Sequence, residues 1–174
     1  MATKLLPVTG VELPSNEFEM RNYKQNLAFS EETLCFKAVI VHLPTKAKMF
    51  VENDGHGGAN MTFWDDSPKV SEASAAWSKF LDDCVPALQA SVADSEYDWV
   101  RDLYNDGNAS EDCVIGLFTN ELSNQKMLSG KRGTVVRKNP ADDAYMVYKA
   151  TPEQLAGRVA GEYWDKKAKN WVAL

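Results

Sequence analysis

The sequence has few of the residues from which most catalytic and metal sites are built. Its 174 residues include two histidines and three cysteines. The cysteines, Cys35, Cys84 and Cys113, are widely spaced and form no CxxC pair, so neither a zinc motif nor a redox motif is indicated. All three lie within apolar patterns, and we expect free, buried thiols. The sequence predicts no metal ligands and no cofactor.

Long apolar runs are also absent. No stretch of about 18 apolar residues could cross a membrane, and the N-terminal residues contain no signal-peptide core. No segment is of low complexity and no linker is visible, while 44% of the residues are hydrophobic. We therefore expect a soluble cytoplasmic protein that makes no membrane contact, with one domain over residues 1–174. The pattern gives no structural prediction for residues 1–30.

Positive charge is scarce and unevenly placed in the chain. The formal net charge is −6, which argues against nucleic acid as the partner. From Trp64 to Asp112 twelve acidic residues face three basic ones, whereas Lys126 to Lys138 contains five basic residues and no acid. This distribution predicts one acidic and one mildly basic region.

The first half of the chain predicts an antiparallel meander followed by helices. Residues 33–43, 46–52 and 60–64 have the β-branched and aromatic content of strands. Asp66-Ser67-Pro68 is typical of a helix start, and apolar residues recur beyond it at helical spacing. The expected stripe is Val70, Ala73, Trp77, Phe80, Leu81, Cys84 and Leu88. Pro86 should kink or break this helix.

Two more helices and a second hairpin are expected after Pro86. A second helix should reach about Tyr104, and a third should run from a Ser110 cap to Leu128 and end at Gly130. Residues 134–138 and 144–149 flank the turn sequence NPADD.

The C-terminal region predicts a last helix. Thr151 to Gln154 form a capping box, and the helix would continue through Leu155, Val159 and Tyr163, with Lys166, Lys167 and Lys169 at its C-terminal end. The expected order is β-β-β-α-α-α-β-β-α. This order predicts an α+β fold with an antiparallel sheet of about five strands and about four helices.

A glycine-rich loop, in the stretch FVENDGHGGANMTFW, is the candidate site. The predicted binding residues are Asn53, Asp54, Gly55, His56, Gly57, Gly58 and Asn60. The loop is not a dinucleotide-binding fingerprint, because Asn60 stands where the third glycine belongs. Flanking glycines expose His56, whereas His42 is expected to be a satisfied residue at a strand end.

The segment NDGHGGAN resembles an Asn-Asp-Gly-x-Gly-Gly-x-Asn pattern of small uncharacterised proteins of phages and mobile elements, where it also lies between a hairpin and a helical region. The resemblance covers the loop and its flanks alone. It implies a genomic setting, and a host cytoplasm as the location of a phage-encoded protein. It assigns no catalytic residue.

These observations favour a non-enzymatic interaction protein, plausibly encoded by a phage, that binds and modulates or inhibits a cellular host protein. The sequence contains no GxSxG elbow and no kinase-like motif set, although it leaves enzymatic activity open. The alternative is a small-molecule or nucleotide-binding protein, in which the amides of Gly55, Gly57 and Gly58 form a nest for a small anionic ligand. A third possibility is that the loop only turns the chain. The oligomeric state is not predicted.

Overall fold

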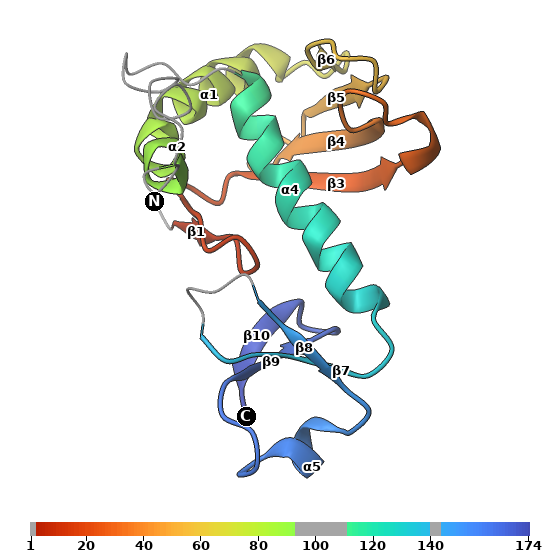
Figure 1. Cartoon of the computed structure of the whole chain (residues 1–174). Helices are drawn as coiled ribbons and strands as arrows, with labels where there is room; N and C mark the ends of the chain where they lie inside the picture. The colour runs from red at the N-terminus through yellow and green to blue at the C-terminus, as the bar shows by residue number, and fades with distance from the viewer. Residues whose placement is uncertain (1–2, 93–110, 140–143) are drawn as a thin grey trace. The chain divides into compact units, whose positions relative to one another are not determined.

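The computed structural model describes residues 3–92, 111–139 and 144–174 (Figure 1). The chain divides into two compact units. Unit 1 contains Met1–Leu6 and Val11–Thr119, and unit 2 contains Pro7–Gly10 and Asn120–Leu174. The predicted single domain over residues 1–174 stays a prediction, because the compactness of each unit does not decide whether both unfold together.

The main sheet of unit 1 has four antiparallel strands in the order β3-β4-β5-β6 (Figure 1). They are β3 (Phe18–Gln25), β4 (Phe36–His42), β5 (Lys48–Asn53) and β6 (Met61–Trp64). The predicted meander of β4, β5 and β6 is confirmed. Strand β3 and the short hairpin of β1 (Lys4–Leu5) and β2 (Glu12–Leu13) lie where the sequence gave no prediction.

Most of the predicted helical stripe is buried in unit 1, although Val70 and Leu81 are half-buried. Helix α1 (Val70–Asp83) buries Ala73, Trp77 and Phe80, and α2 (Val85–Val92) begins beside Pro86, where the proline interrupts the helix. The Trp77 ring lies 4.9 Å from the ring of Phe18 on β3 and 5.5 Å from that of Phe80. The aromatic cluster thus fastens the helix to the sheet.

Helix α4 (Glu111–Gly130) confirms the extent of the predicted third helix. Its residues up to Thr119 belong to unit 1, and those from Asn120 onward belong to unit 2. In unit 1, the Glu111 carboxylate accepts hydrogen bonds from Trp77 Nε1 at 2.6 Å and from Thr62 Oγ1 at 2.8 Å. The predicted Ser110 cap, the second helix beyond residue 92 and most of the NPADD turn lie outside the described residues.

Unit 2 contains a second four-stranded antiparallel sheet, in the order β10-β9-β7-β8. The predicted hairpin is confirmed as β7 (Thr134–Arg137) paired with β8 (Met146–Tyr148). The capping box is also confirmed, because Thr151 Oγ1 accepts from the Gln154 amide at the start of α5 (Pro152–Leu155). Leu128, Val135 and Trp164 form the core of this unit.

The predicted C-terminal helix is wrong beyond Leu155. Helix α5 ends there, and the chain forms the hairpin of β9 (Glu162–Asp165) and β10 (Asn170–Ala173). Gly157 and Gly161 have positive φ angles of 73° and 129°, which a continuous helix does not allow. The lysines expected at a helix end lie instead at the β9–β10 turn, where Asp165 Oδ1 accepts from the Lys167 amide at 2.8 Å.

Within unit 2, the buried carboxylate of Glu121 binds the turn formed by Pro7–Gly10. Glu121 is 2% exposed. Its carboxylate accepts from the Val8 amide at 3.0 Å, the Thr9 amide at 2.9 Å and Thr9 Oγ1 at 3.0 Å, and Gln125 Nε2 also donates to it at 2.8 Å. These donors satisfy a charge that would be destabilising if buried alone.

The α+β class with antiparallel sheets is therefore confirmed, although the predicted element order is not reproduced. The described residues form ten strands in three sheets, where the sequence predicted about five strands. The additional strands come from the unpredicted N-terminal region and from the C-terminal region that was predicted to be helical.

Candidate functional site

The glycine loop lies against a second loop of unit 1. It connects β5 with β6, and the second loop, residues 27–33, begins with the 3-10 turn η1 (Leu27–Phe29). The Gly55 carbonyl accepts hydrogen bonds from the amides of Glu31 and Glu32, each at 3.0 Å, and from that of Thr33 at 3.3 Å. We name residues 27–33 and 53–60 together the clasp.

Asn53 holds the clasp from inside. This side chain is 8% exposed. Its Oδ1 accepts from Thr33 Oγ1 at 2.8 Å and from the Gly55 amide at 2.9 Å, and its Nδ2 donates to the Gly58 carbonyl and to Asn60 Oδ1, each at 3.2 Å. Because its polar atoms are used within the clasp, Asn53 positions the loop and does not face a ligand.

The backbone conformation requires glycine at two of the three glycine positions of the loop. Gly55 and Gly57 have φ angles of 89° and 86°, in the region that side chains disfavour. A Cβ on Gly55 would lie 2.0 Å from the Phe29 carbonyl oxygen, and one on Gly57 would lie 2.1 Å from Glu32 Oε2. Gly58 has neither a positive φ nor an atom within 4 Å of such a Cβ.

His56 lies on the exposed side of the clasp among carboxylates. Its side chain is 56% exposed, and Nε2 is 3.9 Å from Glu31 Oε2. The other ring nitrogen, Nδ1, is 3.1 Å from the Asp54 carbonyl oxygen, and the Asp54 carboxylate accepts from the His56 amide at 3.1 Å. Glu32 is exposed nearby in sequence. This side of the clasp therefore has an acidic character.

The clasp also exposes two large apolar side chains that sequence reasoning missed. Leu27 is 68% exposed and Phe29 is 58% exposed. Both belong to η1, whose Asn26 cap accepts from the Ala28 amide at 3.2 Å. In the sequence, the two apolar residues stand out within the polar stretch NLAFSEE, but the pattern predicted no structure there that would have shown them to be exposed.

Asn60 is directed toward α4 and not toward the clasp surface. Its backbone amide donates to Asp112 Oδ1 at 2.9 Å, and its Nδ2 donates to the same oxygen at 2.7 Å. Of the predicted binding residues, the structure thus leaves Asp54, His56, Gly57 and Gly58 exposed, while Asn53, Gly55 and Asn60 are hydrogen-bonded within the fold.

The loop amides are poorly placed to form an anion nest. The Gly55 amide already donates to Asn53 Oδ1, and the Gly57 amide donates to Thr33 Oγ1 at 3.3 Å. The carboxylates of Glu31 and Asp54 beside His56 would repel an anion. This arrangement favours contact with a cationic or apolar surface.

His42 and the cysteines lie in surroundings that belong to the fold. His42 is buried, stacks on Phe18 with a centroid distance of 4.8 Å, and has its Nδ1 2.8 Å from Thr45 Oγ1. None of the three cysteines forms a disulfide, as predicted, but the expected burial holds for Cys84 alone. Burial, together with neighbouring Asp83, raises the pKa of the Cys84 thiol to about 12, which keeps the thiol protonated and unreactive.

His42 should make stability depend on pH. Burial holds the pKa of His42 below its usual value of 6.5, and the opposing effects of Glu17 and Glu72 are smaller. The folded state therefore binds this proton less readily than the unfolded chain does. The resulting stabilisation is complete above pH 6.5 and is lost as the pH falls through that value toward the lower folded-state pKa.

We expect the thermal unfolding midpoint to fall between about pH 7.5 and pH 5.5, and to fall less in His42→Gln. Differential scanning calorimetry across this range measures the effect. The matched control is Ser71→Ala, which changes an exposed, non-titrating position and should keep the parent slope. An unchanged slope in His42→Gln would contradict the assignment.

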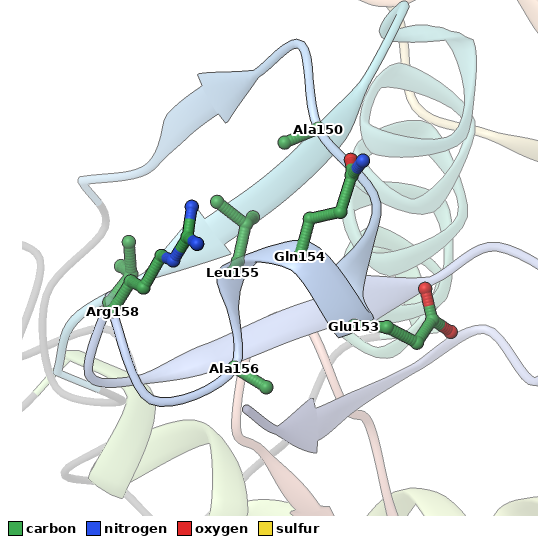
Figure 2. Close-up of a pocket in the computed structure, with 7 residues that line it drawn as sticks. Ala150, Glu153, Gln154, Leu155, Ala156 and Arg158 are labelled. Atoms are coloured by element: carbon green, nitrogen blue, oxygen red, sulfur yellow. The ribbon is translucent and has the colours of Figure 1, made fainter.

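Hollows occur elsewhere on the described surface. The one drawn in Figure 2 surrounds α5 and is lined by Ala150, Glu153, Gln154, Leu155, Ala156, Arg158 and Val159. Gln154 and Arg158 extend to the same side of the turn, whereas Glu153 points away from them (Figure 2). Gln154 is already engaged in the capping box, so among the described residues that line the hollow Arg158 is the cation and Glu153 the carboxylate, and the two point apart (Figure 2).

Among the described residues, no group of three or more histidine, cysteine or acidic side chains could hold a metal ion. Within the same ranges, no helix has the length and apolar character needed to cross a membrane. Comparison with family models, curated proteins and solved structures gave no match to this chain.

Proposed function

We propose that this protein is a non-enzymatic interaction protein that binds and modulates a cellular protein through the clasp. The observation that carries the proposal is the exposure of Leu27 and Phe29 on a loop pair that its own hydrogen bonds hold in place. Burying such a side chain in an interface contributes about 1.5–3 kcal/mol.

Preorganisation favours binding by this surface. Backbone hydrogen bonds to Gly55 and the buried Asn53 side chain fix the two loops before any partner arrives. Less conformational entropy is then lost on association, which leaves more of the contact energy as affinity. Aromatic anchors such as Phe29 at the centre of a polar rim are typical of protein interfaces.

The charge around the anchors indicates the chemistry of the partner. Glu31, Asp54 and Glu32 are exposed acids, and unit 1 as a whole has nineteen acidic and nine basic residues. Opposite charge on the partner would accelerate encounter and set its orientation. We therefore propose a partner surface that combines basic side chains with an apolar hollow for Phe29.

A host setting is part of the same proposal. The resemblance of NDGHGGAN to phage and mobile-element proteins supports a phage-encoded protein whose partner is a host protein in the host cytoplasm. Binding that covers a functional surface of the partner would then inhibit or redirect that partner.

The test is affinity capture from host-cell lysate with three clasp variants, Phe29→Ser, His56→Ala and Gly58→Val. Each changes an exposed position without removing a clasp hydrogen bond made by a side chain of Asn53 or Thr33. We expect each variant to lose at least about tenfold in affinity, or about 1.4 kcal/mol, for the captured protein.

Leu5→Ser is the matched control, because Leu5 is 61% exposed in unit 1 but lies outside the clasp. It should bind like the parent, and all four variants should melt cooperatively within a few degrees of it. Parent-like binding by all three clasp variants would place the binding surface elsewhere.

A further inference from the structure

Unit 2 has a surface of opposite character to the clasp. Tyr145 Oη lies 3.8 Å from Met127 Sδ, and Lys131 Nζ lies 5.6 Å from the centroid of the Tyr145 ring. Lys166 Nζ donates to the Lys131 carbonyl, which brings the β9–β10 turn beside the end of α4. Arg132 and Lys167 are the exposed sequence neighbours of these lysines. We name Met127, Lys131, Arg132, Tyr145, Lys166 and Lys167 the cationic patch.

Positive charge exceeds negative charge in unit 2, and on the cationic patch Asp165 interacts electrostatically with Lys167. The unit has ten basic and six acidic residues. Glu121 is buried among backbone donors, and Glu162 pairs with Arg137 at 2.8 Å. Arg132, Lys166 and Lys167 remain exposed on the cationic patch, beside Met127, which is 42% exposed.

We propose that the cationic patch of one molecule binds the clasp of a second copy of this chain. The two surfaces are complementary in charge, and both expose apolar side chains. The clasp exposes Leu27 and Phe29 on the same loop pair as the carboxylates of Glu31, Glu32 and Asp54. The cationic patch exposes Met127, which contacts Tyr145, together with basic side chains. Opposite charges orient the encounter, and the apolar side chains gain from burial.

Exposed methionine favours a protein over nucleic acid as the occupant of the cationic patch. A phosphate backbone gains nothing from Met127, whereas an apolar residue such as Phe29 can pack against a flexible thioether. Unit 1 also carries a net charge of −10, which would repel a polyanion but supplies the charge that the cationic patch needs.

The junction is heterologous, because two different surfaces meet. Each molecule then keeps one unused clasp and one unused patch at the ends of the assembly, so association can continue beyond a dimer. Self-association also occupies the clasp that the proposed function uses. A concentrated pool would therefore bind the cellular partner less well than dilute protein.

The experiment is sedimentation equilibrium of the purified chain at increasing concentration. We expect the weight-average mass to rise above the 19.4 kDa of the monomer in low salt. In about 1 M salt, where screening acts within about 3 Å, it should return toward the monomer.

Two double variants, one in each surface, test the junction. Glu31→Gln with Phe29→Ser changes the clasp, and Arg132→Gln with Lys167→Gln changes the cationic patch. Each variant alone should be monomeric. An equimolar mixture should form a dimer and stop there, because the intact clasp of one variant meets the intact patch of the other.

Three outcomes would overturn the proposal. They are a monomer at every concentration, self-association that both variants retain, and a mixture that stays monomeric. As a control, Lys138→Gln with Lys149→Gln removes two exposed lysines of unit 2 outside the patch and should associate like the parent.

This inference rests on the clasp of the proposed function, but the two can fail separately. Loss of host-protein capture with intact self-association would reject the proposed function alone. A strictly monomeric chain that still captures a host protein would reject the self-association alone. Binding of an oligothymidylate that the Arg132 and Lys167 variant abolishes, without self-association, would assign the cationic patch to nucleic acid instead.

Discussion

Trp77→Ala is expected to lower the free energy of unfolding by about 3–5 kcal/mol. Trp77 is 3% exposed and packs against Phe18 and Phe80. Its indole nitrogen also donates to Glu111, so the substitution leaves both a cavity and a carboxylate without that donor. Chemical denaturation measures the loss, and Trp77→Phe separates its two parts because the ring packing is largely kept.

The phenylalanine variant should lose less than the alanine variant, about 1–3 kcal/mol, since it removes the hydrogen bond and part of the ring. Ser71→Ala, at an exposed position of α1, should change stability by less than about 0.5 kcal/mol. A loss below about 1 kcal/mol in Trp77→Ala would mean that the helix does not pack on the sheet through this side chain.

Gly55→Ala is expected to destabilise unit 1 by about 3 kcal/mol. The φ angle of 89° disfavours any side chain by about 1–2 kcal/mol, and the added Cβ would lie 2.0 Å from the Phe29 carbonyl oxygen. Relief of that overlap must move η1 away, which weakens the amide bonds from Glu31 and Glu32 to the Gly55 carbonyl. Urea denaturation followed by tryptophan fluorescence measures the loss.

Gly58→Ala is the matched control in the same loop. Its φ is not in the positive range, and its added Cβ meets no atom within 4 Å, so we expect a change within about 0.5 kcal/mol. Equal losses in the two variants would show that the clasp is not the source of the requirement for glycine at residue 55.

The parts of the fold that sequence predicts well are those fixed by nearby residues. The α1 stripe and the β4, β5 and β6 meander follow from local periodicity, and the break at Pro86 follows from the missing amide. Strand β3 was not predicted because positive φ at Asn22 shifts its register and interrupts the alternation begun by Phe18 and Met20.

The C-terminal hairpin could not be predicted from spacing alone. Leu155, Val159 and Tyr163 recur at a helical interval, but they belong to α5, a turn and β9. What excludes the helix is distant in sequence. Strand β9 pairs with β7, with Tyr163 opposite Val136, and this pairing takes the place of the helix.

The sequence predicted where the candidate site lies, but not the contacts between the two loops that form it. The loop from Asn53 to Asn60 has the turn conformation that its glycines suggested, and His56 is exposed as expected. Local sequence could not show that Gly55 and Gly57 serve contacts with residues 29–33. Nor could it show that Leu27 and Phe29 are exposed on the clasp, because the pairing of the two loops joins residues 20 and 24 positions apart.

The division of the chain between its units restricts how the protein can be dissected. The backbone passes from one unit to the other after Leu6, after Gly10 and after Thr119. A single proteolytic cut in α4 before Glu121 would therefore leave Pro7–Gly10 covalently attached to unit 1 segments, and would place the Glu121 carboxylate, which accepts from Val8 and Thr9, on the other fragment. Fragments made by cutting the gene at Thr119 would divide Glu121 from the turn that it binds, so complementation of the two fragments is a more promising route than expression of either alone.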